Sequence, residues 1–493
     1  MQLGRNIDTT AKFHRAVLLA AIVVHGITAW FSSGYHSADE HFQIIAFAQA
    51  AVGELPIEHL PWEYATGIRS SFQPWVAVSV FKIAGAFGIS DPFTRTLLLR
   101  SLTAFLALFA MHRFVRATLE QVPTSFRKVY IILTYFLWFL PFLHVRFSSE
   151  GWSAIFLLIG LTELLRNERH VAWRSVTGIA FGFAMLCRPP VGLIVLSGLA
   201  WLLFIRKDGW RSVGMICAGI LFALGIGLGL DSAFYSEPTW SLGRYLHMGF
   251  GGDPQVRFDT LPWWYYLPWV VKYAIPPIGI CMLAAFSVLV VRSPKHLLVW
   301  CILPYLIVHS IIPHKELRFL YPLADLMPLM LILGSVKLRE WIPAPSYPTV
   351  GIAVTLVFGL SNVSGLLVVT TNAAGIGRTR IAATLDQQTT EGAMIAYVIE
   401  PAEAWRISLP AFYLPAGMRD TAFTVDTFPN ASLQVEYLVA QDPDAERMKQ
   451  RIGGSMDLIC STEPAWASEL MRWYTWGEGP GTWRLYRIGA EGP

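Results

Sequence analysis

The sequence predicts an all-α polytopic membrane protein with a small α/β domain at its C-terminal end. Hydrophobic residues make up 54% of the 493 residues and charged residues only 15%, a balance that a soluble protein does not need. Repeated runs of about 20 apolar residues have the length of a transmembrane helix. Clusters of Lys and Arg separate many of these runs, and such clusters mark cytoplasmic loops.

Placing every positive cluster in the cytoplasm, beginning with Arg5, Lys12 and Arg15, gives about eleven spans. The apolar stretch 73–89 cannot be a further span, because it would invert all the following ones. We therefore expect it to be a helix on the outer membrane surface, within one long outer loop at 33–93. The predicted spans are 16–32, 94–115, 129–144, 151–166, 174–187, 191–206, 212–230, 264–291, 297–313, 320–336 and 349–370.

The composition changes after the last apolar run, so residues 1–370 are expected to form the membrane module and 371–493 an extracytoplasmic domain. Runs 393–399 and 422–425 are typical of strands, and 444–452 is typical of a helix. The five cysteines lack the spacing of a disulfide framework or a metal site, and no acidic cluster suits Mg²⁺ or Mn²⁺. We expect no metal, no cofactor and no nucleic-acid partner.

A cluster of ionisable residues, 314–319, lies between two apolar runs on the predicted outer side. Such residues at a membrane boundary are costly unless they line a polar cavity or meet a charged partner. Lys315 would meet a phosphate as a point charge, Arg318 as a bidentate fork, and His314 could add to them. Glu316 could hold one of these cations. The alternative is a positively charged loop that anchors a helix end.

Six motifs in order then connect the outer loops to a known family. They are HSADEHFQ at 36–43, WEY with IRS at 62–70, RFSS at 146–149, DSAFY at 231–235, PWWYY at 262–266 and HKELRF at 314–319. Together they resemble motifs of the dolichyl-phosphate-mannose-dependent α-mannosyltransferases of GPI-anchor assembly and N-glycan extension, glycosyltransferase family 22. Ser37-Ala38 stands where that family has a single Pro. Ser149 stands where it has an Asn, and Trp264 where it has a His. These departures favour a bacterial relative that uses a polyprenyl-phosphate sugar.

The resemblance implies the C-type glycosyltransferase fold and an inverting transfer of a mannosyl or related hexosyl unit. The donor would be a polyprenyl-phosphate sugar, the acceptor a hydroxyl of a lipid-linked glycan, and membrane lipid the third partner. Asp39 is the candidate base and Glu40, beside it, the second catalytic candidate. The alternative for both is N-capping of a helix that begins at His41. The donor phosphate is assigned to His314, Lys315 and Arg318.

The remaining candidates are expected to bind substrate. For Asp231 the alternative to substrate binding is a structural role. For Trp263 and Trp264 the alternative is anchoring of a helix at the membrane interface. Arg146 and Arg188 would meet phosphates or cap helix ends. The assigned substrate-binding residues are His36, Gln43, Glu63, Arg69, Arg146, Asp231, Trp263, Trp264 and Glu316.

The expected location is a bacterial inner membrane with the active site facing the periplasm, or the endoplasmic reticulum membrane of a eukaryote. The competing function is a transporter or flippase of lipid-linked sugars, which would share the many spans and the membrane charges. Such proteins often contain paired internal repeats. We find no repeat, and the charges gather at one predicted face, so the transferase is preferred.

Overall fold

The computed structural model describes residues 2–166, 173–251, 260–340, 347–375, 377–388, 392–401, 407–415, 417–428, 435–474 and 482–489. The chain forms two compact units. The helical unit comprises Met1–Thr28, Ala38–Ile83 and Leu99–Thr370. The sheet unit comprises Ala29–Ser37, Ala84–Leu98 and Thr371–Pro493, so it includes two short segments from the N-terminal part of the chain.

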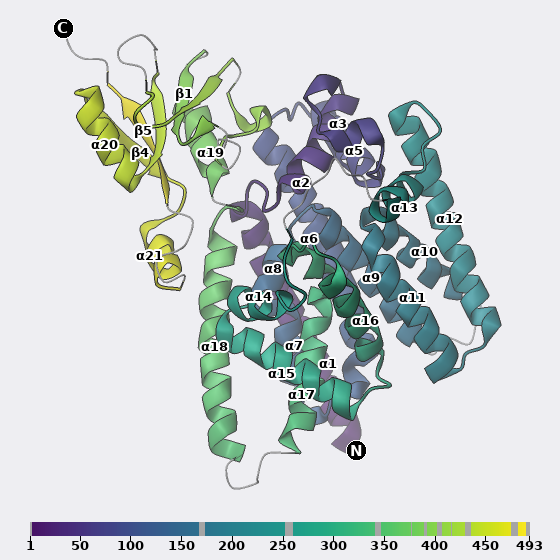
Figure 1. Cartoon of the computed structure of the whole chain (residues 1–493). Helices are drawn as coiled ribbons and strands as arrows, with labels where there is room; N and C mark the ends of the chain where they lie inside the picture. Colours follow the sequence, from purple (N-terminus) through teal and green to yellow (C-terminus); the bar gives the residue numbers. More distant parts are fainter. Residues whose placement is uncertain are drawn as a thin grey trace. The chain divides into compact units, whose positions relative to one another are not determined.

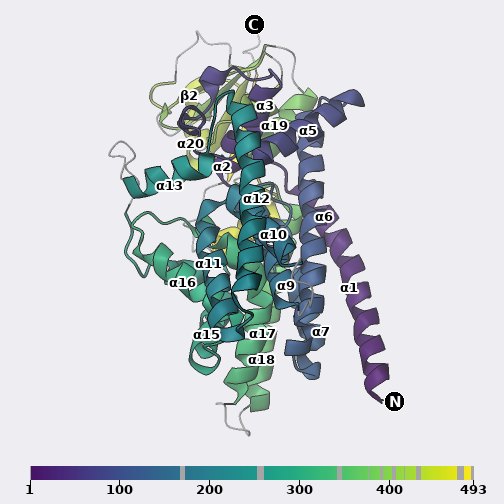
Figure 2. The ribbon, with the colours of Figure 1, turned by 90° about the vertical axis from the view of Figure 1, so that its right-hand side faces the viewer.

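Every predicted span coincides with a helix or with two consecutive helices (Figures 1 and 2). The stretch 73–89 is also helical, and its position on the membrane surface stays a prediction. The longer helices are α1 (Gln2–Phe31), α5 (Phe72–Ala86), α6 (Pro92–Thr118), α7 (Arg127–Phe136), α9 (Ser149–Leu165), α10 (Trp173–Cys187), α11 (Gly192–Trp201), α12 (Trp210–Tyr235), α13 (Ser241–Gly251), α15 (Pro276–Arg292), α16 (Leu297–Ile311), α17 (Met327–Arg339) and α18 (Tyr347–Thr371). The shorter ones are α2 (Ala38–Glu40), α3 (Ala46–Ala51), α4 (Trp62–Thr66), α8 (Phe139–Leu143) and α14 (Tyr266–Tyr273).

Within the described residues, six helical segments are long and apolar enough to cross a membrane. A seventh is possible if α15 and α16, which meet at a bend of 114°, form one broken span. The chain is therefore an integral membrane protein, and the count of about eleven spans stays a prediction. The six segments are Thr9–Phe31, Pro92–Gln121, Pro189–Arg206, Trp210–Tyr235, Leu317–Arg339 and Gly351–Thr371.

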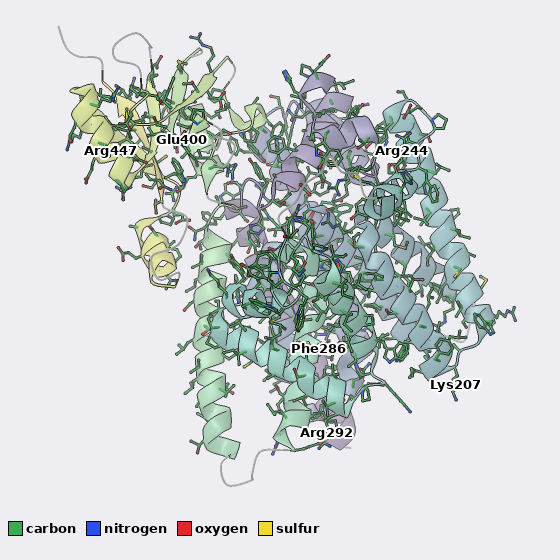
Figure 3. The ribbon with its side chains drawn as sticks, in the orientation of Figure 1. Lys207, Arg244, Phe286, Arg292, Glu400 and Arg447 are labelled. Atoms are coloured by element: carbon green, nitrogen blue, oxygen red, sulfur yellow. The ribbon has the colours of Figure 1, made fainter. Side chains whose placement is uncertain are left out.

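Two of the loops predicted to be cytoplasmic lie at the same end of the helical unit. Lys207 and Arg292 mark that end in Figure 3, and Arg244 of α13 lies toward the opposite end. The amino terminus of α1 is at the end marked by Lys207 and Arg292 (Figure 1). This arrangement is what the positive-inside pattern requires, although the side of the membrane that each end faces stays a prediction.

Small residues allow three of the helices to pack tightly. Helix α10 packs against both α9 and α12. At the crossing with α12, a methyl group on Gly178 would overlap the carbonyl of Ile216, and one on Gly219 would overlap the carbonyl of Ser175. Close backbone approach at small residues is a common way of joining helices in membranes. These glycines therefore fix how α12, which carries a site motif at its C-terminal end, sits against α10.

Two irregular helical segments border the acidic and basic motifs. The π-helix η1 (His41–Ile45) directly follows Asp39 and Glu40. The 3₁₀-helix η7 (Leu317–Leu326) carries Arg318 and runs for ten residues, whereas most 3₁₀ runs are much shorter. Both types of segment often mark functional positions. No side-chain capping bond supports Glu40 at the start of η1, so N-capping does not explain this residue.

The described part of the sheet unit contains five strands in the order β2-β1-β3-β5-β4. Strand β1 is parallel to β2 and β3, and β5 is antiparallel to β3 and β4. Alternate residues of β1 belong to hydrophobic clusters on opposite faces of the sheet. Ile395 is in one cluster with Leu385 of α19, and Ala396 is in the other with Met448 of α20. The expected α/β class is confirmed. The elements are α19 (Arg378–Gln388), β1 (Met394–Val398), β2 (Arg419–Phe423), β3 (Tyr437–Gln441), α20 (Asp442–Ile452), β4 (Met456–Ser461), α21 (Ala465–Tyr474) and β5 (Trp483–Ile488).

Candidate active site

The carboxylate of Asp39 lies between two guanidinium groups. Its Oδ2 is 2.5 Å from Nη1 of Arg318 and 3.8 Å from Nη2 of Arg69. These three residues come from α2, from the segment before α5, and from η7, so chain folding brings together motifs that are far apart in sequence. The side chains of Asp39 and Arg318 are 19% and 14% exposed, which leaves the pair partly accessible to a ligand.

Two further ion pairs are almost completely buried near this group. Arg146 Nη1 lies 3.6 Å from Glu40 Oε1, and Arg188 Nη1 lies 3.4 Å from Glu150 Oε1. The same Glu150 oxygen is 3.7 Å from Nη1 of Arg318, so two guanidinium groups converge on one carboxylate. All three distances are longer than a good hydrogen bond between charged groups.

Glu316 orients Arg318 from within the basic motif. Its carboxylate accepts hydrogen bonds from Nε of Arg318, at 2.5 Å, and from Nη2 of Arg318, at 3.0 Å. The carboxylate also lies 3.0 Å from Nε2 of His314. Burial alone would raise the pKa of Glu316, but hydrogen bonding and the charge of Arg318, assisted by His314, hold the pKa below its usual value. Glu316 is therefore ionised at neutral pH and fixes the fork of Arg318 in one orientation.

Lys315 has a different placement from its neighbours in the motif. Its Nζ donates to the carbonyl oxygens of Leu261, at 3.1 Å, and Ile312, at 2.5 Å. The backbone N–H of Leu261 also donates to the carbonyl of Pro313, at 2.9 Å. The ammonium thus ties two loops together, and the structure does not bring it to the carboxylates that surround Arg318.

Glu63 and Gln43 line the Arg69 side of the group. Nε2 of Gln43 donates to Oε1 of Glu63 at 2.8 Å, and the same oxygen lies 3.9 Å from Nη2 of Arg69. Both side chains are buried. The predicted residues Gln43, Glu63 and Arg69 therefore belong to one connected polar cluster with Asp39.

Asp231 holds the backbone next to Arg69 and does not face the ion pairs. Its Oδ1 accepts from the backbone N–H of Ser71 at 2.7 Å, from the Ser71 hydroxyl at 2.8 Å and from the Ser70 hydroxyl at 3.3 Å. Nearby, the hydroxyl of Tyr235 donates to the carbonyl of Arg69 at 2.7 Å. The end of α12 therefore clamps the segment that presents Arg69, a positioning role.

Two predicted substrate contacts, Trp263 and Trp264, have no polar contact with this cluster among the described interactions. Trp263 and Trp264 are 68% and 46% exposed, which fits the alternative of anchoring at a membrane interface. His36 belongs to the sheet unit and is exposed. The sequence also missed Glu150 as a site residue, although its place in an outer loop directly after the RFSS motif was a usable signal.

The cluster as a whole is rich in carboxylates. Four arginines, at 69, 146, 188 and 318, face five acidic residues, at 39, 40, 63, 150 and 316. An anionic ligand must therefore compete with side-chain carboxylates for the guanidinium groups. Among the described residues, no group of three or more His, Cys, Asp or Glu is placed to hold a metal ion.

Comparison with known proteins gives a consistent family. The family model described as the Alg9-like mannosyltransferase family matches residues 16–394. GPI mannosyltransferase 3 of Candida albicans is 23% identical over 66% of this chain and 64% of its own length. GPI alpha-1,2-mannosyltransferase 3 of Danio rerio is 23% identical over 68% of this chain and 62% of its own length. The chain thus covers less than two thirds of these relatives.

Solved structures agree on the fold. ArnT from Cupriavidus metallidurans bound to undecaprenyl phosphate superposes with a TM-score of 0.54 at 15% identity, covering 97% of this chain and 98% of that one. Its apo state gives a TM-score of 0.53 at 16% identity, with 91% and 96% covered. The predicted C-type glycosyltransferase fold is therefore confirmed.

Proposed function

Because the chain belongs to the Alg9-like mannosyltransferase family, we propose that it is an inverting membrane mannosyltransferase. It moves a mannosyl unit from a polyprenyl-phosphate donor to a hydroxyl of a lipid-linked glycan. The observation that carries this proposal is the contact between a carboxylate, Asp39, and the guanidinium groups of Arg318 and Arg69. Such a transfer needs a base and a phosphate site in one pocket, with the bound sugar between them.

The leaving group of the reaction is a phosphate, which gains negative charge as the bond to the sugar breaks. Arg318 meets this phosphate through its planar fork, and Arg188 lies beside it on the shared carboxylate of Glu150. Both cations are held in place before the substrate arrives. The phosphate displaces the carboxylate of Asp39 from Arg318, whose guanidinium is already oriented by Glu316 to stabilise the developing charge. Lys315 does not serve the phosphate in this proposal, because its ammonium is bound to backbone carbonyls.

Asp39 takes the proton of the acceptor hydroxyl as that oxygen attacks the anomeric carbon. The sugar then passes from a β-linked donor to an α-linked product in a single displacement with one base. When donor phosphate takes up Arg318, the carboxylate of Asp39 is released from its closest partner and can accept a hydrogen bond from the acceptor hydroxyl. Arg69 remains beside it.

The donor's prenyl chain stays in the bilayer while its phosphate lies at the interface. This arrangement suits a site whose acidic and basic residues follow apolar helices, and we propose that it faces the extracytoplasmic side. The names of the curated relatives support mannose as the sugar. ArnT, which shares the fold, was solved with undecaprenyl phosphate bound, and this supports a polyprenyl carrier.

The test uses the purified full chain in lipid nanodiscs with polyprenyl-phosphate-[³H]mannose and a panel of lipid-linked acceptors. We expect label to appear in an acceptor, and Asp39→Asn to abolish most of this transfer. No transfer to any acceptor, together with movement of the intact lipid-linked sugar across proteoliposomes, would instead support the flippase alternative. Release of free mannose alone would argue against a glycan acceptor.

A further inference from the structure

A chain of three buried polar side chains lies in the helical unit and is not used in the proposed mechanism. Nδ1 of His25, in α1, is 2.8 Å from the carbonyl oxygen of Ala21, and its Nε2 is 3.0 Å from Nδ1 of His144. Nε2 of His144 is 2.8 Å from Oδ1 of Asp325, in η7. The three side chains are almost fully buried, with at most 4% of each residue exposed.

The number of protons in this chain follows from its ends. Three hydrogen bonds require three protons, and a carbonyl oxygen and a carboxylate oxygen supply none. Since the carbonyl of Ala21 only accepts, Nδ1 of His25 must carry a proton. Two neutral imidazoles contribute two protons in all, so one bond needs a third. That proton resides on Asp325, making it a neutral acid, or on one imidazole, making it a cation beside the carboxylate.

Either placement makes the trio of His25, His144 and Asp325 neutral overall. Without the third proton, two acceptor atoms would face each other in a buried site and the carboxylate would keep an uncompensated charge. Within the described part of the chain, Asp325 forms its ion pair with His144, which is itself buried. All three hydrogen bonds are therefore complete only when the third proton is present, and the three bonds hold it along a fixed line of atoms.

The trio joins α1 to two segments that carry site residues. His144 directly follows α8 as its C-cap and is two residues before Arg146, whose guanidinium lies beside Glu40. Asp325 lies in the same 3₁₀-helix as Arg318. The segment that begins at His144 continues to Ser148, whose hydroxyl caps α9 by accepting from the N–H of Gly151 at 3.0 Å. Movement of His144 would therefore displace Arg146 relative to Arg318.

We propose that His144 is a positioning residue: one proton shared among His25, His144 and Asp325 locks the segment 144–148 to η7 and α1. This lock sets the position of Arg146, and through it Glu40 beside Asp39. The proton count stands by itself, while the effect on turnover rests on the proposed function.

The first test reads the protons directly, without any activity. The full-length protein is labelled with ¹⁵N-histidine and studied by NMR in nanodiscs, with signals assigned by difference against His144→Gln and His25→Gln. We expect a proton in each of the three bonds, so that no ring nitrogen of His25 or His144 shows the shift of a bare lone pair. A bare, unbonded nitrogen in either ring would overturn the proposal, whatever the outcome of the transfer assay.

The second test compares two replacements of Asp325. In Asp325→Asn the amide N–H can donate to Nε2 of His144 and supply the third proton without a charge. Asp325→Leu has a similar volume and can neither donate nor accept. We expect the Asn variant to keep kcat within about threefold and the Leu variant to lose at least about tenfold, since small misplacements of a catalytic geometry have effects of this size or larger.

The melting temperature of each variant in the same nanodiscs separates positioning from folding. A folded Leu variant with native kcat would overturn the proposal, and so would an Asn variant that fails as badly as Leu while its melting temperature matches that of the native protein. If the Leu variant does not fold, the Asn variant and the NMR reading still decide.

Discussion

The substitution Asp39→Asn is expected to tighten donor binding while it slows sugar transfer. Asp39 Oδ2 lies 2.5 Å from Nη1 of Arg318, so the carboxylate neutralises the guanidinium that we assign to the donor phosphate. The sequence alone assigns Asp39 and Arg318 separate roles, as base and as phosphate ligand, and would predict little change in donor binding. The ion pair reverses this expectation, because the incoming phosphate and Asp39 compete for the same cation.

The size of the effect follows from charge, distance and screening. Two unit charges about 5 Å apart interact by roughly 3 kcal/mol at an effective dielectric constant of about 20. Both side chains are partly exposed, which screens this repulsion, and Asn orients Arg318 less well than a carboxylate does. We therefore expect a net gain of about 1.4 kcal/mol, which is roughly tenfold tighter donor binding. The chemical step should slow by about 10²–10⁴-fold, the usual contribution of a general base.

The measurement pairs equilibrium binding of radiolabelled polyprenyl-phosphate-mannose with single-turnover transfer in the same nanodiscs. Glu237→Gln is the matched control, because it also removes one carboxylate, but one that pairs with Arg244 instead of Arg318. The control should change neither quantity. Weaker donor binding by Asp39→Asn would refute the competition, and near-native turnover would place the base elsewhere, with Glu40 the next candidate.

The other predictions concern the phosphate site, a helix crossing and the topology. Arg318→Ala should weaken donor binding and slow single-turnover transfer, and Arg318→Lys should restore only part of each, because an ammonium lacks the bidentate fork; full rescue by Lys would contradict this. Gly178→Leu should lower the melting temperature through a clash worth about 1–3 kcal/mol or more, whereas Gly225→Leu, on open space in α12, should not. An alkaline phosphatase fused after Pro493 should be active in a bacterial host; activity of a cytoplasmic reporter there instead would refute the span scheme.

Helix positions were largely predictable because each apolar run must satisfy its own backbone hydrogen bonds in the bilayer. The same physics does not fix where a run bends. The run 320–336, for example, begins as 3₁₀-helix η7 and becomes α-helical only at Met327. In the sheet unit, the continuous apolar run of β1 was recognised, while the short strands β4 and β5 have mixed sequences whose pairing depends on distant partners.

The site was predictable at the level of motifs but not of side-chain direction. Asp39 and Arg318 are separated by most of the helical unit in sequence, and the structure brings their side chains together. Their location on the outer side stays a prediction. The direction of Lys315 depends on carbonyl groups freed at a helix end, which composition does not reveal. Asp231 likewise finds its partners in Ser70 and Ser71. Ser70 belongs to the IRS motif, but nothing in the sequence pairs it with Asp231.

The geometry of the buried ion pairs favours function over stability as their explanation. Removing two charges from water costs more than a loose pair returns, and well-packed apolar residues in their place are often as stable or more so. Arg146 with Glu40, at 3.6 Å, and Arg188 with Glu150, at 3.4 Å, are both loose pairs in this sense. Carboxylates at such distances keep guanidinium groups ordered, yet can be exchanged for a phosphate at modest cost. Cations held in this way suit the proposed site, which would bind and release a phosphate in every cycle.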